Sequence, residues 1–130
     1  MKKLTIPALA LLTATFFLSA MPDDGIMVKE HGVYIINTTA LASDVEGYEN
    51  TTPLKIYIKK NKIIKIEALR NQETPKYFAK VKKQLLDKWN GMAVKQALAT
   101  EVDGVTGATY SSKAVKENVR RGISYYKQHK

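Results

Sequence analysis

The ten residues from Asp103 to Ser112 combine chemical groups that suit the binding of a phosphate. Gly104 and Gly107 allow the backbone to turn tightly and to approach a ligand closely. Four hydroxyl side chains follow within the segment, namely Thr106, Thr109, Ser111 and Ser112. A helix predicted over residues 111–128 would add unpaired backbone N–H groups and the positive end of its dipole, both of which favour an anion.

Helix capping is the structural alternative for the same segment. Ser and Thr are common at the N-cap of a helix, where the side-chain oxygen accepts a backbone N–H. One hydroxyl is enough for a cap, however, so the four in this segment exceed what a cap requires.

The pattern Asp103-x-x-Thr106-Gly107-Ala108-Thr109-x-Ser111 resembles the flavinylation motif of FMN-binding domains. Such domains occur in one subunit of sodium-translocating NADH:quinone reductase, in one subunit of the related Rnf complex and in small stand-alone exported proteins. The resemblance implies that FMN is joined to Thr109 by a phosphoester bond. It also implies that a separate, magnesium-dependent flavin transferase makes this bond from FAD.

The same resemblance implies roles for the neighbours of the acceptor threonine. Asp103 would present the motif to the transferase, although a turn or cap acid is its alternative role. Gly107 and Ala108 would be small because the phosphate and the ribityl chain lie against their backbone. Thr106 and Ser111 would donate hydrogen bonds to the phosphate.

A second part of the resemblance lies upstream, where Glu73-Thr74-Pro75 matches a Glu-Thr-Pro sequence of the family. Glu73 and Thr74 would lie near the isoalloxazine ring, and Pro75 would fix the turn. Ordinary helix capping is the alternative for these residues. Lys76 stands where family members often have Gly. The resemblance covers residues 47–127.

Hydrophobic patterning predicts the strands that position these motifs. Val33–Thr38 is rich in β-branched and aromatic residues and indicates a strand. Further along, apolar and polar residues alternate, which predicts an antiparallel hairpin with one buried face. The residues expected on that face are Leu54, Ile56, Ile58, Ile64, Ile66 and Ala68. Lysines 55, 59, 60, 62 and 65 are expected in solvent. Residues 39–53 favour a loop, and residues 92–102 form a short apolar segment that could be a strand.

Two helices are predicted from apolar residues spaced three to four apart. The first begins at Pro75, ends at Asn90-Gly91, and buries Tyr77, Phe78, Val81, Leu85 and Trp89. Its aromatic residues are expected in the core rather than stacked on a flavin. The second covers residues 111–128 and buries Ala114, Val115, Val119, Ile123 and Tyr126. The predicted fold is α+β, a small antiparallel sheet with helices packed against it.

Residues 1–20 are typical of a secretory signal peptide. Lys2 and Lys3 precede an apolar stretch from Leu4 to Leu18, and small residues follow it. An uncleaved membrane anchor is the alternative, and both place the rest of the chain outside the cytoplasm, either in the periplasm or anchored and facing outward. Residues 21–46 are expected to hold a loose lead-in (21–32) and the first strand, followed by the FMN-binding domain at 47–127.

Composition narrows the possible functions. The absence of cysteine excludes disulfides and thiolate metal sites, and two distant histidines make a metal site unexpected. Without Lys2 and Lys3, 19 basic residues stand against 12 acidic ones, a net charge of +7. That charge suits an anionic partner, but the strand lysines are expected to be a solvated face, so nucleic acid is not expected.

No acid–base pair or activated nucleophile is recognisable in the sequence, so no catalytic residue is expected. The hypothesis is therefore an extracytoplasmic electron carrier that is not itself an enzyme. Its partners would be the flavin transferase and a redox protein or membrane electron-transfer complex. The alternatives are a basic, non-catalytic exported binding module for a membrane surface or polyanion, and a small structural domain in which the motif is only a cap.

Overall fold

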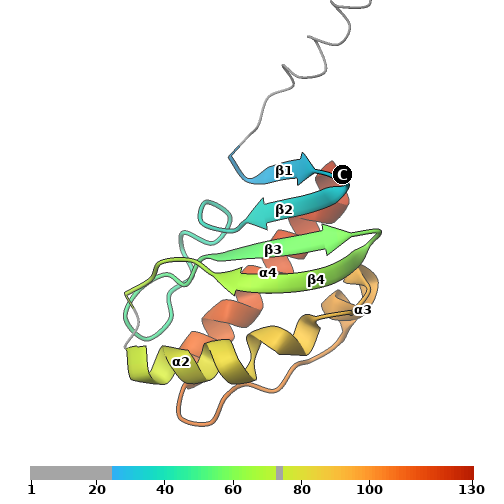
Figure 1. The fold of residues 1–130 in the computed structure, drawn as a ribbon. Coiled ribbons are helices and arrows are strands. Elements are labelled where there is room, and N and C mark those ends of the chain that lie inside the picture. The colour runs from blue at the N-terminus through green and yellow to red at the C-terminus, as the bar shows by residue number, and fades with distance from the viewer. Residues whose placement is uncertain (1–24, 73–74) are drawn as a thin grey trace, which may run out of the picture.

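A computed structural model describes residues 25–72 and 75–130 of the chain (Figure 1). Glu73, Thr74 and the predicted export segment at 1–20 lie outside the described residues. Four antiparallel strands form one sheet in sequence order: β1 (Met27–Glu30), β2 (Val33–Asn37), β3 (Leu54–Lys59) and β4 (Lys62–Ala68). The helices are α2 (Pro75–Gln84), the 3-10 helix η1 (Leu86–Trp89), α3 (Val94–Ala99) and α4 (Thr109–His129). The α+β prediction is confirmed.

The β3–β4 hairpin is confirmed, but its buried face differs at one position. Lys60 and Asn61 form the turn with φ of 52° and 62°, the left-handed conformation that two-residue hairpins use. The register then shifts, because Tyr57 pairs with Lys65 whereas Ile58 pairs with Ile63. Ile64 is the extra residue of this bulge, and 44% of it is exposed, so its predicted burial is wrong.

Two segments differ from the predicted elements. The lead-in at 21–32 contains β1, which pairs with β2 across a turn at His31 and Gly32. The segment 92–102 holds α3 rather than a strand, with Val94 and Ala97 buried one helical turn apart. The apolar run was too short for sequence periodicity to distinguish a strand from a helix.

The helix predicted after Pro75 is two elements, α2 and η1. The predicted core positions Phe78, Val81, Leu85 and Trp89 are buried. The side chain of Tyr77 lies outside the described residues. Gly91 has a φ of 85°, which explains why a glycine ends this helical region.

Helix α4 packs against β2 and β3, and η1 packs against β4. In Figure 1, α4 runs diagonally behind the sheet while α2 lies below β4. All five apolar positions predicted for the inner face of α4 are buried: Ala114, Val115, Val119, Ile123 and Tyr126. Gly122 sets the closeness of this packing, since a Cβ there would lie 2.5 Å from Ile56 Cδ1. Within residues 25–72 and 75–130, no helix is both long and apolar enough to cross a membrane.

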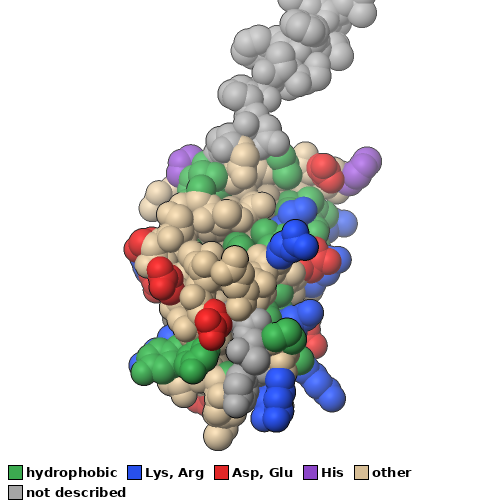
Figure 2. Space-filling model, turned by 90° about the vertical axis from the view of Figure 1, so that its left-hand side faces the viewer, with side chains coloured by type: hydrophobic (Ala, Val, Ile, Leu, Met, Phe, Trp, Pro, Cys, Tyr) green, Lys and Arg blue, Asp and Glu red, His purple; other side chains and the backbone are tan. Residues whose placement is uncertain are grey.

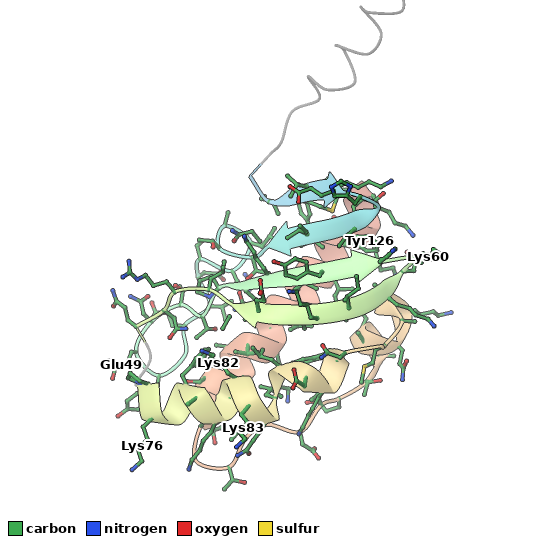
Figure 3. The ribbon with its side chains drawn as sticks, viewed as in Figure 1. Glu49, Lys60, Lys76, Lys82, Lys83 and Tyr126 are labelled. Atoms are coloured by element: carbon green, nitrogen blue, oxygen red, sulfur yellow. The ribbon has the colours of Figure 1, made fainter. Side chains whose placement is uncertain are left out.

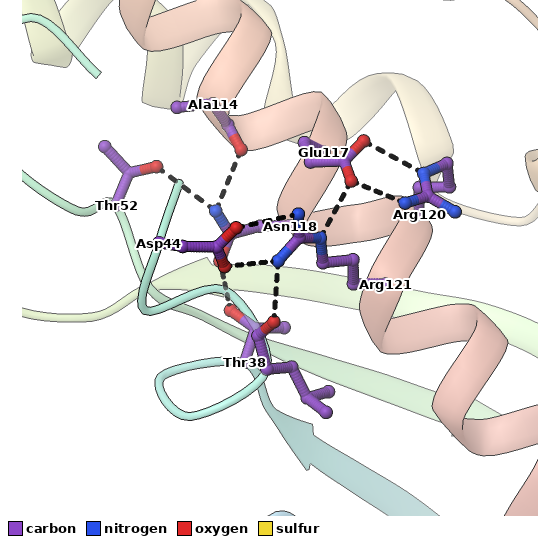
Figure 4. Close-up of polar contacts among 9 residues, drawn as sticks. Thr38, Asp44, Thr52, Ala114, Glu117, Asn118, Arg120 and Arg121 are labelled. Carbon is purple, nitrogen blue, oxygen red and sulfur yellow. Dashed lines mark hydrogen bonds and ion pairs between the residues drawn. The ribbon is translucent and has the colours of Figure 1, made fainter. Parts of the chain in front are cut away.

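A buried polar network links α4 to the sheet and to the loop before β3 (Figure 4). The Thr38 hydroxyl donates to Asn118 Oδ1 and accepts the Leu54 N–H at 2.9 Å. The Asn118 amide donates to the Ala114 carbonyl at 2.8 Å and to Thr52 Oγ1 at 3.4 Å. Thr38, Thr52 and Asn118 are at most 1% exposed. Because each polar group has a partner, the network costs little to bury and fixes one arrangement.

Asn118→Ala should therefore lower the free energy of unfolding by about 2–3 kcal/mol, because it leaves buried hydroxyls unpaired and opens a small cavity. Urea unfolding measures this loss. The matched control is Gln128→Ala, an exposed position on the same helix that should stay within about 0.5 kcal/mol of wild type. Equal stability of the two variants would contradict a structural role for the network.

Candidate functional site

The motif segment turns sharply before it enters α4. Gly107 adopts a φ of 85°, a left-handed conformation that favours glycine, and the Ala108 N–H bonds the Val105 carbonyl at 3.0 Å. Ala108 is the buried N-cap residue, and Thr109 is the first of the 21 residues of α4. The Thr109 side chain is exposed. The turn therefore places the predicted acceptor hydroxyl at the surface, at the positive end of a long helix.

None of the four hydroxyl residues holds the N-cap position of α4. The N-cap position is held by Ala108, which makes no side-chain capping hydrogen bond. The Ser112 hydroxyl instead accepts the Val105 N–H at 3.0 Å and so holds the loop against the helix. Thr106 and Thr109 are both exposed. The predicted use of a Ser or Thr as the N-cap residue is therefore wrong for α4.

Thr109 lies in a surface hollow of about 300 Å³, lined by Gly104, Val105, Thr106, Thr109, Ser112, Lys113 and Lys116. Gly104 permits this shape, because a Cβ there would come within 3.1 Å of Ser112 Cβ. Lys113 and Lys116 follow Thr109 by four and seven residues and so share its face of the helix. Neither lysine was predicted from the sequence as a site residue, although helical spacing counted from Thr109 identifies both.

The charges around the hollow are mainly positive. Lys116 pairs with Glu101 at 2.8 Å, and the Glu101 side chain is 85% exposed, so solvent screens this contact strongly. Lys88 donates to the backbone carbonyl of Asp103 at 3.1 Å and so holds the start of the motif. Hydroxyls, ammonium groups and helix N–H groups are typical hydrogen-bond donors to a phosphate. These residues therefore fit a ligand with a terminal phosphate group.

The structure brings together only some of the predicted site residues. Thr106 and Thr109 share the hollow, with Gly107 and Ala108 in the turn between them. Asp103 is exposed just outside it. Ser111 is 3% exposed and is not part of the lining, whereas its neighbour Ser112 is.

The upstream motif is only partly described. Pro75 is exposed at the start of α2, whereas Glu73 and Thr74 lie outside the described residues. Lys76 is exposed on α2, as is Lys83 further along the helix (Figure 3). Because the backbone at Lys76 is helical, that position does not require the glycine often found in the family.

The loop at residues 39–53 is fastened to α4 by an ionic cluster (Figure 4). Arg121 donates to the Asp44 carboxylate, to the Leu41 carbonyl at 3.0 Å and to Glu117 at 2.8 Å. Arg120 donates to the other oxygen of Glu117 at 2.9 Å. The hydrogen bonds from Arg120 and Arg121 lower the pKa of Glu117 to about 2. The hydrogen bond from Arg121 also holds the pKa of Asp44 below its ordinary value.

The fastened loop meets the motif at one end of the domain. Asn50 Nδ2 donates to Gln72 Oε1 at 3.2 Å, which ties the loop to the residue that precedes Glu73 and Thr74 in the chain. Tyr48 of the loop lies beside Tyr110, the residue after the acceptor threonine. Figure 2 looks onto the side of the molecule that lies at the left of Figure 1, and shows hydrophobic side chains protruding from its lower part.

The fold and the site together describe a small α+β domain whose surface suits a phosphate-bearing ligand. A family model for the FMN-binding domain matches residues 47–124, more than half of the chain. The chain therefore belongs to the FMN-binding domain family, and it is an FMN-binding flavoprotein. No match was found among curated proteins or among solved structures. The matched range begins in the loop, includes the β3–β4 hairpin and ends within α4.

The ionic cluster predicts how stability depends on pH. The pKa of Glu117 is lowered from 4.5 to about 2 in the folded protein, so its stabilisation is complete above the unfolded value and is lost as the pH falls toward 2. Thermal unfolding followed between about pH 5 and pH 2 should show a smaller fall in melting temperature for Glu117→Gln than for wild type. Glu101→Gln, at a highly exposed carboxylate, is the control and should fall as wild type does. An unchanged pH dependence in Glu117→Gln would contradict the role of the cluster.

Proposed function

We propose that this flavoprotein carries FMN covalently on Thr109 and transfers electrons between proteins outside the cytoplasm. The observation that carries the proposal is the exposed Thr109 hydroxyl at the first position of α4, inside a hollow shared with Lys113 and Lys116. That hydroxyl makes no N-cap contact for α4, since the cap residue is Ala108. It is therefore available to a modifying enzyme.

The attachment step balances as a phosphoryl transfer. Thr109 Oγ forms a bond to the FMN-side phosphorus of FAD, and the bond from that phosphorus to the AMP phosphate breaks. AMP leaves, and the hydroxyl proton passes to a base. A threonine hydroxyl is a weak nucleophile, so base and magnesium would come from the flavin transferase. Exposed Asp103, just outside the hollow, would help that enzyme recognise the motif.

The remaining residues of the hollow would hold the product. The phosphodiester carries one negative charge, which Lys113 and Lys116 would balance together with the N-terminal end of α4. Thr106 would donate a hydrogen bond to a phosphate oxygen. Ser112 would keep the loop closed through its contact with the Val105 N–H. Glu73 and Thr74 stay predicted neighbours of the ring.

Electron transfer is the use that this placement favours. The flavin, when bound, supplies reversible one- and two-electron chemistry. A tether at the surface leaves the ring accessible to partner proteins, and a covalent bond prevents loss of the cofactor where no cytoplasmic pool can replace it. The protein would be a substrate of the flavin transferase rather than an enzyme, and its electrons would come from a redox protein or a membrane complex.

A basic binding module for a membrane surface or polyanion is the alternative. Exposed lysines such as Lys60, Lys76 and Lys83, labelled in Figure 3, would serve it. This alternative does not use the hydroxyls of the hollow, and it predicts a colourless protein. A flavoprotein of the proposed kind stays yellow after denaturation.

Thr109→Val tests the attachment directly, because valine keeps the shape of the side chain and removes the hydroxyl. Wild-type protein made with a flavin transferase should gain the mass of FMN less one water and fluoresce on a denaturing gel. The valine variant should show neither, and the matched variant Thr109→Ser should keep both. Wild-type flavin should also be reduced by dithionite and reoxidised by an added acceptor. A flavin adduct that persists in Thr109→Val would exclude this residue, and a bound flavin inert to both reagents would exclude the carrier role.

Export is a separate prediction based on Lys2, Lys3 and the apolar stretch that follows them. A reporter that is active only outside the cytoplasm, fused after Lys130, should be active. Deletion of residues 1–20 should abolish its activity, because the export signal would be lost. The control is a variant that changes Lys60, which is exposed in the β3–β4 turn, to Gln and should be exported normally. Full flavin loading of protein confined to the cytoplasm would contradict this prediction.

A further inference from the structure

Two exposed tyrosines lie beside the proposed attachment residue. Among the described residues, the large hydrophobic side chains that are exposed are Tyr48 at 66%, Tyr110 at 65% and Ile64 at 44%. Ile64 belongs to the bulge in the sheet. The rings of Tyr48 and Tyr110 have centroids 6.5 Å apart and are tilted by 37°, within the range of an aromatic pair. They form one aromatic surface at the start of α4, where Tyr110 directly follows Thr109.

Both tyrosines are carried on backbone that is firmly held. Tyr110 is the second residue of α4. Tyr48 sits in a tight loop closed by the Gly47 N–H to Asn50 carbonyl bond at 2.8 Å and by the isolated bridge between Glu46 and Thr51. The ionic cluster at Arg121 and the buried Asn118 network fasten the same loop to α4. The backbone that carries the aromatic surface is therefore held in place before any ligand arrives.

The exposed part of an aromatic side chain does not stabilise the fold through burial. It stabilises a complex when a ligand covers it. An aromatic ligand gains most, since offset stacking adds to the gain from area alone. A backbone held beforehand also spares the entropy of ordering the loop on binding. The two tyrosines thus suit a flat aromatic group that is delivered close to Thr109.

We propose that Tyr48 and Tyr110 are the contact surface for the isoalloxazine ring of the flavin on Thr109, an inference that rests on the proposed function. The phosphoester fixes one end of the cofactor at the start of α4, and the ribityl chain limits the ring to the surface nearby. The tethered ring reaches the tyrosine pair at a high effective concentration. Packing on the tyrosines covers part of the ring and quenches its fluorescence, while the rest stays open to partners.

Native flavin fluorescence tests this contact on the full chain loaded by a flavin transferase. The variants are Tyr48→Ala and Tyr110→Ala, with Ile64→Ala as the control at the other exposed hydrophobic residue. Loss of one aromatic contact should lower the ratio of packed to free ring by about fivefold. The ratio of native to denatured fluorescence should therefore rise in both tyrosine variants, as should quenching by iodide, and neither should change in Ile64→Ala. Tyr48→Phe should keep the packing, as seen in unchanged iodide quenching.

The denatured samples distinguish a failure of the proposed function from a failure of the tyrosine contact. Absence of covalent flavin in denatured wild-type protein would overturn the proposed function itself. Normal loading of Tyr48→Ala with wild-type native fluorescence and iodide quenching would overturn only the tyrosine contact. If Tyr110→Ala is poorly loaded with flavin, the Tyr48→Ala variant tests the contact by itself. Tyr48 lies far from Thr109 in sequence, so its substitution leaves the attachment motif unchanged.

Discussion

The buried carboxamide of Asn118 connects parts of the chain that are far apart in sequence. It contacts Thr38 just after β2, Thr52 just before β3 and Ala114 one turn earlier in α4. A buried amide without partners would be costly, so these contacts favour one arrangement of the three segments. Because Thr38 and Thr52 bracket most of the loop at 39–53, the same contacts fix that loop relative to α4. The geometry of the site depends on this constraint.

Helix α4 packs into the core with one face and carries the proposed attachment residue, Thr109, on another. Val115, Val119 and Ile123 are fully or almost fully buried, which fixes the rotation of the helix about its axis. That rotation determines where Thr109 emerges. Since helical spacing puts Lys113 on the face of Thr109, the positive charge near Thr109 follows from the same packing. The proposed acceptor hydroxyl thus stands on a rigid element, and the loop fastened to α4 places Tyr48 next to Tyr110.

Sequence patterns predicted the parts of the fold governed by local periodicity. The inner face of α4 and the β3–β4 hairpin follow from spacings of three to four residues and of two. The bulge at Ile64 could not be predicted, because it depends on pairing between strands, and either Ile63 or Ile64 would satisfy the burial pattern. α3 was missed because a helix of six residues leaves too few apolar positions. In the candidate site, the motif predicted Thr109 as the attachment residue, whereas the Tyr48–Tyr110 contact joins residues distant in sequence and required the fold.

Fragment-ion mass spectrometry of one tryptic peptide tests the central claim most directly. Cleavage after Lys95 and Lys113 releases residues 96–113, which contain every hydroxyl of the motif. In protein matured with a flavin transferase, the fragments should place the mass of FMN less one water on Thr109 alone. The same mass on Thr106, Ser111 or Ser112, or an unmodified peptide from fully matured protein, would contradict the account.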